Sequence, residues 1–335
     1  MHPLRLRLTD GFCIFKAKIS SLMPNIAVII ATHNRCALLP RAVESARLAS
    51  SDREIVVVDD ASEDQTREVC RRWADVRYQR AKRRLGLGAA RNVGLIASTA
   101  PYVTFLDDDD VRLPGSLDAQ IKLLEAQPDA GLIYGKALYG DEGCNANGSS
   151  YPEKCRHGDL FWELLRWNFI PCPTVVFRRA CLTRVGLLEE DAPGVEDWDL
   201  WVRLAELYSV MATDQTVAIW RQGTPASEQF TSHAEKLHRE ARRLLRDKWL
   251  RLPRAVDAGA APRREAARDF ATCASQQLIW EAASRLKAGR VLESARVALA
   301  GARMYPWGVS KKILSLSTLR SLISGAENYW RAERA

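Results

Sequence analysis

Short runs of apolar, β-branched residues alternate with helical segments over the first third of the chain, and this alternation limits the fold more than any other feature. The runs Ile26–Ala31, Glu54–Asp59 and Tyr102–Leu106 have the length of strands. Between them, Leu38–Ala49 and Leu87–Ala97 carry apolar residues at helical spacing. Strands that alternate with helices predict βαβ units. We therefore expect an α/β fold with a mostly parallel sheet and flanking helices.

The chain up to about residue 228 contains further, weaker signals of the same kind. We expect helices over Asp64–Trp73, Gly115–Ala126, Gly158–Trp167 and Glu196–Leu207, and strands over Val76–Gln79, Gly131–Tyr134, Thr174–Phe177 and Thr216–Trp220. The stretch Gly140–Ser150 is rich in Gly, Asn and Ser, which predicts a loop.

The chain beyond residue 228 changes character and predicts only helices. Amphipathic patterns cover Phe230–Leu250, Arg264–Leu286, Val291–Met304 and Ile313–Ile323. Residues 231–335 carry 21 Lys and Arg against 10 Asp and Glu, whereas residues 1–230 carry 28 against 31. We therefore divide the chain into a leader over 1–23 with no assigned function, an α/β domain over 24–228 and a basic helical region over 229–335.

The basic region has two interpretations. Its charge is that of solvated helix faces in a bundle or a homodimer, or that of a peripheral contact with an anionic membrane surface. No nucleic acid is expected as a partner, because no recognition motif accompanies the charge. No apolar run approaches the roughly 18–20 residues that span a bilayer. The eight cysteines form no Cys-x-x-Cys pair, which excludes a zinc ribbon and favours a reducing, cytoplasmic compartment.

Four consecutive acids, Asp107–Asp110, follow the strand candidate Tyr102–Leu106 directly. Ligand sites in α/β sheets lie beyond the carboxyl ends of strands, and crowded carboxylates need a compensating cation. Hard oxygen ligands suit Mg²⁺ or Mn²⁺ that also holds substrate phosphates. The alternative is an exposed acidic turn that caps the next helix.

Two other acidic groups follow or begin regular elements. Asp59 and Asp60 end a strand, where they could accept hydrogen bonds from a base or a ribose, although Ser62 or Asp64 could equally form a helix N-cap. Asp197 begins a helix beside tryptophans, where partial desolvation would favour a general base. Each group is weak evidence alone.

A glycine-rich segment, Gly86–Arg91, resembles the start of a dinucleotide fingerprint. Its sixth position is Arg91, and it follows the third strand instead of opening the fold. NAD or FAD binding is therefore not expected. Arg91 could instead contact a phosphate.

Five motifs in one order resemble those of the family 2 glycosyltransferases of GT-A fold. They are Ile29–Arg35, Val56–Ser62, Gly86–Gly94, Phe105–Asp110 and Glu196–Trp201. The resemblance covers about residues 24–225, and five ordered motifs are far more specific than any single one.

The resemblance implies a role for each matching residue. Thr32, Asn34, Asp59, Asp60, Arg91, Asp107 and Asp108 would bind the nucleotide sugar, Asp107 and Asp109 would hold the divalent metal with Asp109 favoured as the direct ligand, and Asp197 would be the catalytic base. The chain departs from the family pattern in two ways. Ala31 and His33 replace the usual proline and tyrosine, and no histidine follows the last strand within Trp220–Thr224, with His233 a doubtful substitute.

The implied activity is sugar transfer from a nucleotide-diphosphate sugar to a carbohydrate or lipid-linked hydroxyl acceptor, with inversion and metal assistance, in surface polysaccharide or glycolipid synthesis. Two alternatives stay open. One is sugar-phosphate nucleotidyl transfer, which normally needs a basic Gly-rich loop where Ala31–Arg35 stands. The other is a non-catalytic carbohydrate-binding or membrane-associated protein that has kept the fold.

Overall fold

The computed structural model describes residues 24–222 and 234–304. Their contacts form two units. The first holds residues 24–159, 170–190 and 207–222, and the second holds residues 160–169, 191–206 and 234–304. The predicted division at residue 228 stays a prediction, and the contacts assign two short earlier segments to the helical unit. The leader 1–23 and the predicted helix Ile313–Ile323 lie outside the described residues.

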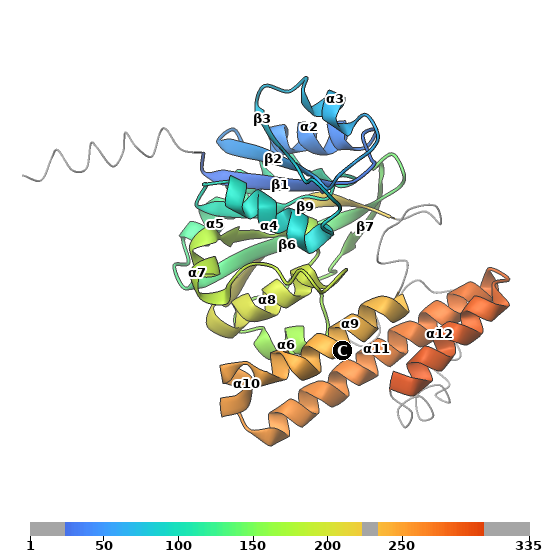
Figure 1. Ribbon diagram of the computed structural model, residues 1–335. Helices are drawn as coiled ribbons and strands as arrows, with labels where there is room; N and C mark the ends of the chain where they lie inside the picture. The colour runs from blue at the N-terminus through green and yellow to red at the C-terminus, as the bar shows by residue number, and fades with distance from the viewer. Residues whose placement is uncertain (1–23, 223–233, 305–335) are drawn as a thin grey trace, which may run out of the picture. The chain divides into compact units, whose positions relative to one another are not determined.

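The first unit is built on one nine-stranded sheet (Figure 1). Its strands are β1 (Ile26–Thr32), β2 (Arg53–Asp59), β3 (Val76–Arg80), β4 (Tyr102–Phe105), β5 (Val111–Arg112), β6 (Ala130–Gly140), β7 (Ala146–Tyr151), β8 (Val176–Arg178) and β9 (Ser209–Arg221). The order is β3-β2-β1-β4-β8-β6-β9-β5, with β7 paired to β6. The pairs β1–β2, β1–β4, β2–β3 and β6–β9 are parallel, so the expected α/β class is confirmed.

Helices connect these strands as the alternating pattern predicted. In the first unit they are α2 (Leu39–Ala49), α3 (Thr66–Cys70), α4 (Leu87–Ala97), α5 (Ser116–Glu125) and α7 (Leu182–Val185), with short 3₁₀ turns η1 (Cys172–Thr174) and η2 (Arg179–Cys181). The helix expected over Asp64–Trp73 is shorter than predicted and covers only Thr66–Cys70. Asp64 accepts hydrogen bonds from the backbone and hydroxyl of Thr66 just before α3 begins.

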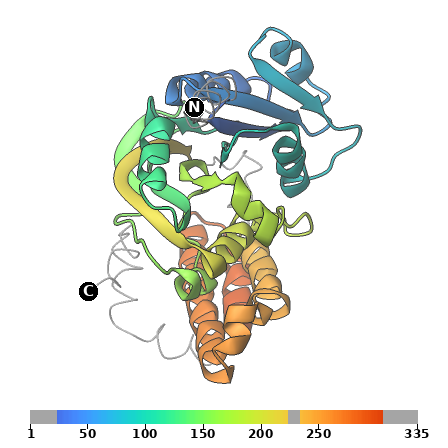
Figure 2. The same cartoon turned by 90° about the vertical axis from the view of Figure 1, so that its left-hand side faces the viewer.

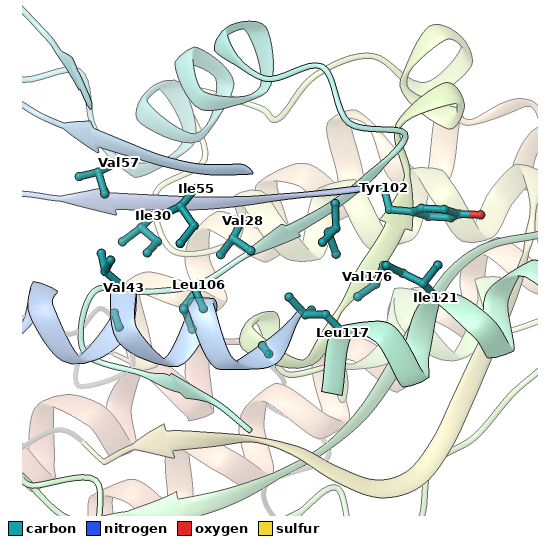
Figure 3. Close-up of a cluster of buried hydrophobic side chains, with 14 of the residues drawn as sticks. Val28, Ile30, Val43, Ile55, Val57, Tyr102, Leu106, Leu117, Ile121 and Val176 are labelled. Atoms are coloured by element: carbon teal, nitrogen blue, oxygen red, sulfur yellow. The ribbon is translucent and has the colours of Figure 1, made fainter. Parts of the chain in front are cut away.

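Alternate residues of the central strands face a core formed with α2 and α5. Figure 3 shows Val28 and Ile30 of β1 on the same side as Val43 of α2 and Leu117 of α5. All four side chains are fully buried. Burial of each such side chain contributes about 1.5–3 kcal/mol before entropy is counted, so this layer holds β1 against α2 and α5.

The other face of β1 and β2 packs against α4 at very close range. Val56, Val58 and Ala90 form this second core. Gly94 of α4 lies so near β1 that an added Cβ would meet Ile29 Cγ2 at 2.3 Å. Only glycine fits there without a shift of the helix or the strand, and the position of α4 therefore depends on it.

The far part of the sheet differs from expectation. The predicted loop Gly140–Ser150 ends in β7, and the predicted strands Gly131–Tyr134 and Thr216–Trp220 are parts of the longer β6 and β9. β9, the yellow strand in Figure 2, bends as it runs beside β6, and three register shifts interrupt this pairing. Bulges of this kind bend a strand and re-aim its side chains.

The second unit is helical. It contains α6 (Phe161–Arg166), α8 (Glu196–Leu207), α9 (Ala234–Asp247), η4 (Trp249–Arg251), α10 (Pro253–Asp257), α11 (Ala260–Lys287) and α12 (Val291–Met304). Trp198 packs against Trp249 with ring centroids 5.2 Å apart, and its Nε1 donates to the carbonyl of Leu164. The tryptophans of the Glu196–Trp201 motif therefore form the core of this unit.

Helices α11 and α12 form a hairpin around Gly289, whose φ is +75°. Two serine hydroxyls join them: Ser275 donates to the carbonyl of Gly301, and Ser294 to that of Ala282. No helix within 24–222 or 234–304 is both long and apolar enough to cross a membrane. A peripheral membrane contact stays a prediction.

Candidate functional site

Three polar segments meet at the carboxyl edge of the sheet in the first unit. Thr32 ends β1, Asp59 ends β2, and the acidic tetrad, defined as Asp107–Asp110, lies between β4 and β5. Because β1 pairs in parallel with both β2 and β4, all three segments follow strand ends on one edge. Thr32 Oγ1 donates to Asp108 Oδ2 at 2.6 Å, which joins the first and third segments.

Arginine side chains from four parts of the unit contact the tetrad. Arg91 Nη2 lies 2.6 Å from Asp107 Oδ1. Arg35 Nη1 lies 3.1 Å from Asp108 Oδ1 and 3.4 Å from Asp109 Oδ2. Arg221 Nη1 lies 3.3 Å from the same Asp109 oxygen, and Arg41 Nη2 donates to the Asp109 carbonyl at 3.4 Å.

The sequence prediction missed three of these four arginines. Arg35 belongs to a quoted motif but was given no role, and Arg41 lies in α2. Arg221 is the last residue of β9, within the segment noted for its missing histidine. The signal that could have indicated Arg221 was its position directly after the predicted strand Thr216–Trp220, because binding residues are expected at strand ends.

Burial perturbs the inner acids of the tetrad. It raises the pKa of Asp108 to about 7, against the opposing effects of Arg35 and of the Thr32 hydrogen bond. Burial, and then the charges of Asp107 and Asp109, raise the pKa of Asp110 well above its usual range. Asp110 Oδ1 accepts from the backbone N–H of Arg221, and Oδ2 is buried without a hydrogen-bond partner.

The tetrad suits a divalent cation in its chemistry. Its carboxylates are hard oxygen donors, the Asp107 side chain is 36% exposed, and the buried Asp110 Oδ2 has no hydrogen-bond partner. Within the described part of the chain, no three His, Cys, Asp or Glu side chains converge as a complete metal site. One or two carboxylates are enough for Mg²⁺ or Mn²⁺ when phosphates supply further ligands.

Asp59 and Asp60 hold the loops beside the tetrad. Asp59 is fully buried, and it accepts from the backbone of Ser62 at 2.7 Å, from Arg80 at 2.8 Å and from the hydroxyl of Tyr78. Asp60 accepts from the backbone N–H groups of Leu85 and Gly86. Gly86 directly precedes α4. Asp60 therefore fixes the start of the helix that carries Arg91.

The loop after β1 is held to the loop after β2. Asn34 has a left-handed backbone with φ +53°, and its backbone N–H donates to Ser62 Oγ at 3.0 Å. Its side-chain oxygen accepts from the backbone of Glu63 at 2.7 Å. His33 Nδ1 lies 2.7 Å from the carbonyl of Asp60. The predicted nucleotide contacts of Thr32, Asn34, Asp59 and Asp60 stay predictions.

Asp197 lies in the second unit, in the first turn of α8. Its Oδ1 accepts from the backbone N–H of Trp198 at 2.6 Å, and its side chain is only partly buried. The neighbouring Glu196 is 2% exposed. Of these two adjacent acids, Asp197 is the one that solvent reaches more readily, and a general base must be accessible to its substrate.

Comparisons of the sequence with known proteins find glycosyltransferases. Residues 27–185 match the model of glycosyl transferase family 2. Relatives described as uncharacterized glycosyltransferases include one from Rickettsia felis, 28% identical over 58% of this chain, and one from Methanocaldococcus jannaschii, 24% identical over 54%. The chain covers only 32% and 64% of the length of these two relatives.

Solved structures resemble the fold at low identity. Residues 1–349 of S. aureus TarS in complex with UDP-GlcNAc give a TM-score of 0.56 at 16% identity, covering 90% of this chain and 79% of that one. The mannosyltransferase PcManGT from Pyrobaculum calidifontis, in complex with GDP-Man and Mn²⁺, gives 0.53 at 20% identity, covering 85% and 88%. The family model therefore identifies a glycosyl transferase family 2 domain over residues 27–185, and the likeness to these structures shows a GT-A-type fold.

Proposed function

We propose that this protein transfers a sugar from a nucleotide-diphosphate sugar to a hydroxyl group of a carbohydrate or lipid-linked acceptor, with inversion and with a divalent cation. The observation that carries the proposal is the meeting of the acidic tetrad with four arginines at the carboxyl edge of the sheet. Few ligands need such crowded charges of both signs, and a nucleoside diphosphate with its cation is one that does.

The donor diphosphate would bind at this edge. Asp107 and Asp109 would hold the cation, which when bound offsets the negative charge that develops on the leaving diphosphate. Arg35 and Arg221 lie close enough to Asp109 to contact phosphate oxygens at the same place. Arg91 lies over the ring of Phe105, 5.2 Å from its centroid, and orients Asp107.

Asp197 would act as the general base. As the acceptor oxygen forms its bond to the anomeric carbon, the bond from that carbon to the diphosphate oxygen breaks. The hydroxyl proton passes to a carboxylate oxygen of Asp197. Attack on the face opposite the leaving group gives inversion. The base is needed because a sugar hydroxyl is a poor nucleophile at neutral pH.

A donor panel tests the proposal. Purified protein is melted with UDP-, GDP- and dTDP-sugars, each with Mn²⁺ or with EDTA, and the stabilised pairs are then assayed for release of nucleoside diphosphate with candidate acceptors. A donor that raises the melting temperature and releases its diphosphate only with an acceptor supports transfer. Stabilisation without transfer to any acceptor would favour the non-catalytic binding protein, and no stabilisation by any donor contradicts the proposal.

A further inference from the structure

The carboxylate favoured as the direct metal ligand already has cationic partners. Arg35 Nη1 and Arg221 Nη1 both lie within 3.4 Å of Asp109 Oδ2. The Asp109 carbonyl also accepts from Arg41 and from the thiol of Cys144. Both faces of this residue are therefore held by donors that reach it from distant parts of the chain.

Two guanidinium groups on one carboxylate oxygen do electrostatically what a divalent cation would do. The Asp109 side chain is 4% exposed, so water screens these contacts weakly, whereas the Arg35 side chain is 26% exposed and is reached by solvent. A cation that binds Asp109 must displace an arginine or bind beside two positive charges. Either route costs free energy.

We infer that Arg35 and Arg221 are built-in counter-ions that compete with the divalent cation for Asp109, so that the donor-free protein binds the cation weakly. A diphosphate would offer these arginines another anionic partner and release Asp109 to the cation. Cation and diphosphate would then bind with positive coupling. Arg35 is in this sense a positioning residue. The inference rests on the proposed function, but it concerns only the competition between the two arginines and the cation for the Asp109 carboxylate.

Cation affinity without donor tests this directly. Mn²⁺ binding to the full-length protein is measured by electron paramagnetic resonance and calorimetry at low ionic strength. We expect Arg35→Gln to bind Mn²⁺ about tenfold more tightly than wild type, since one competing charge is gone. Arg47→Gln is the matched control. It removes the same positive charge from the protein, but Arg47 pairs with Asp75 and Glu44 and not with the tetrad. It should leave the affinity unchanged.

Two further variants complete the test. Asp109→Asn in the Arg35→Gln background should abolish the gain, which shows that the new affinity uses Asp109. Arg221→Gln should give a gain in the same direction, and it serves if Arg35→Gln fails to fold by circular dichroism. The inference is overturned if Arg35→Gln and Arg221→Gln bind Mn²⁺ no more tightly than Arg47→Gln. Because no sugar is transferred in this assay, its failure is separate from failure of the proposed activity.

Discussion

Both units contain buried acids, but the hydrogen-bond partners of these acids differ between the two units. In the helical unit, Asp199 is fully buried, and each of its oxygens is matched by donors: Arg203 at 2.7–2.8 Å, Lys248 at 3.0 Å and Trp249 at 2.9 Å. In the sheet unit, four acids are crowded together and Asp110 Oδ2 has no hydrogen-bond partner. Asp199 is thus satisfied by donors of its own unit, whereas the tetrad keeps one buried oxygen, Asp110 Oδ2, that no protein donor among the described residues satisfies.

The largest effect should come from Asp109→Ala in the sheet unit. We expect turnover and metal-dependent donor binding to disappear, because the favoured metal ligand is lost. The fold should survive, because both arginines retain another hydrogen-bond partner: Arg35 still donates to Asp108, and Arg221 still donates to the carbonyl of Glu142. Diphosphate release and thermal melting measure the two properties. Full activity, or unchanged activity in excess EDTA, would contradict the metal role.

The second effect concerns the base. Asp197→Asn keeps the shape of the side chain and removes its basicity, so kcat should fall about 10²-fold or more while donor affinity changes little. Steady-state kinetics with the identified donor measures both. Glu196→Gln is the comparison. If Asp197→Asn works at nearly the wild-type rate and Glu196→Gln is inactive, Glu196 is the base instead.

The third variant tests the helical side of the comparison. Asp199→Ala leaves Arg203 and Lys248 without their shared acid inside the unit, so the free energy of unfolding should fall by about 3–5 kcal/mol. Urea denaturation measures it. Asp247→Ala, which removes an exposed partner of Arg246, should change stability much less. Equal losses in the two variants would show that Asp199 is no structural centre.

The smallest effect is a pH dependence in the tetrad. Burial raises the pKa of Asp108 to about 7, so the folded state keeps a proton that the unfolded state releases near pH 4. This stabilisation is complete below about pH 4 and is lost as the pH rises to about 7. Relative to Asp108→Asn, wild-type stability should therefore fall by about 1 kcal/mol or more over this range, since one pKa unit corresponds to about 1.4 kcal/mol. Melting curves at several pH values that run parallel for the two proteins would contradict it.

The central sheet could be predicted from sequence because its signals are local. Apolar β-branched runs gave β1, β2 and β4, and their parallel pairing placed the tetrad beside Thr32. β7 was missed because Ala146–Tyr151 is polar and glycine-containing, and it forms a strand only through its pairing with β6. The two residues of β5 were too short to give any pattern.

The site was predicted in part for the same reason. Acids that follow strands are visible in a sequence, whereas the arginines that reach them are not. The Arg221 side chain reaches Asp109 across 112 positions of the chain, and the bend of β9 that brings it there accompanies its irregular pairing with β6. Long, flexible side chains also allow many partners, and packing alone decides among them.

Gly94 couples the position of helix α4 to the position of Arg91. It lies three residues after Arg91, and its missing side chain lets the helix rest directly on Ile29. A single methyl group at residue 94 would push α4 away from β1. The guanidinium group of Arg91, which contacts Asp107, would move with the helix. A change that touches no ligand would thus loosen the acidic edge at a distance. An engineer who wishes to weaken donor binding gradually, without altering any charge, would begin with the volume of residue 94.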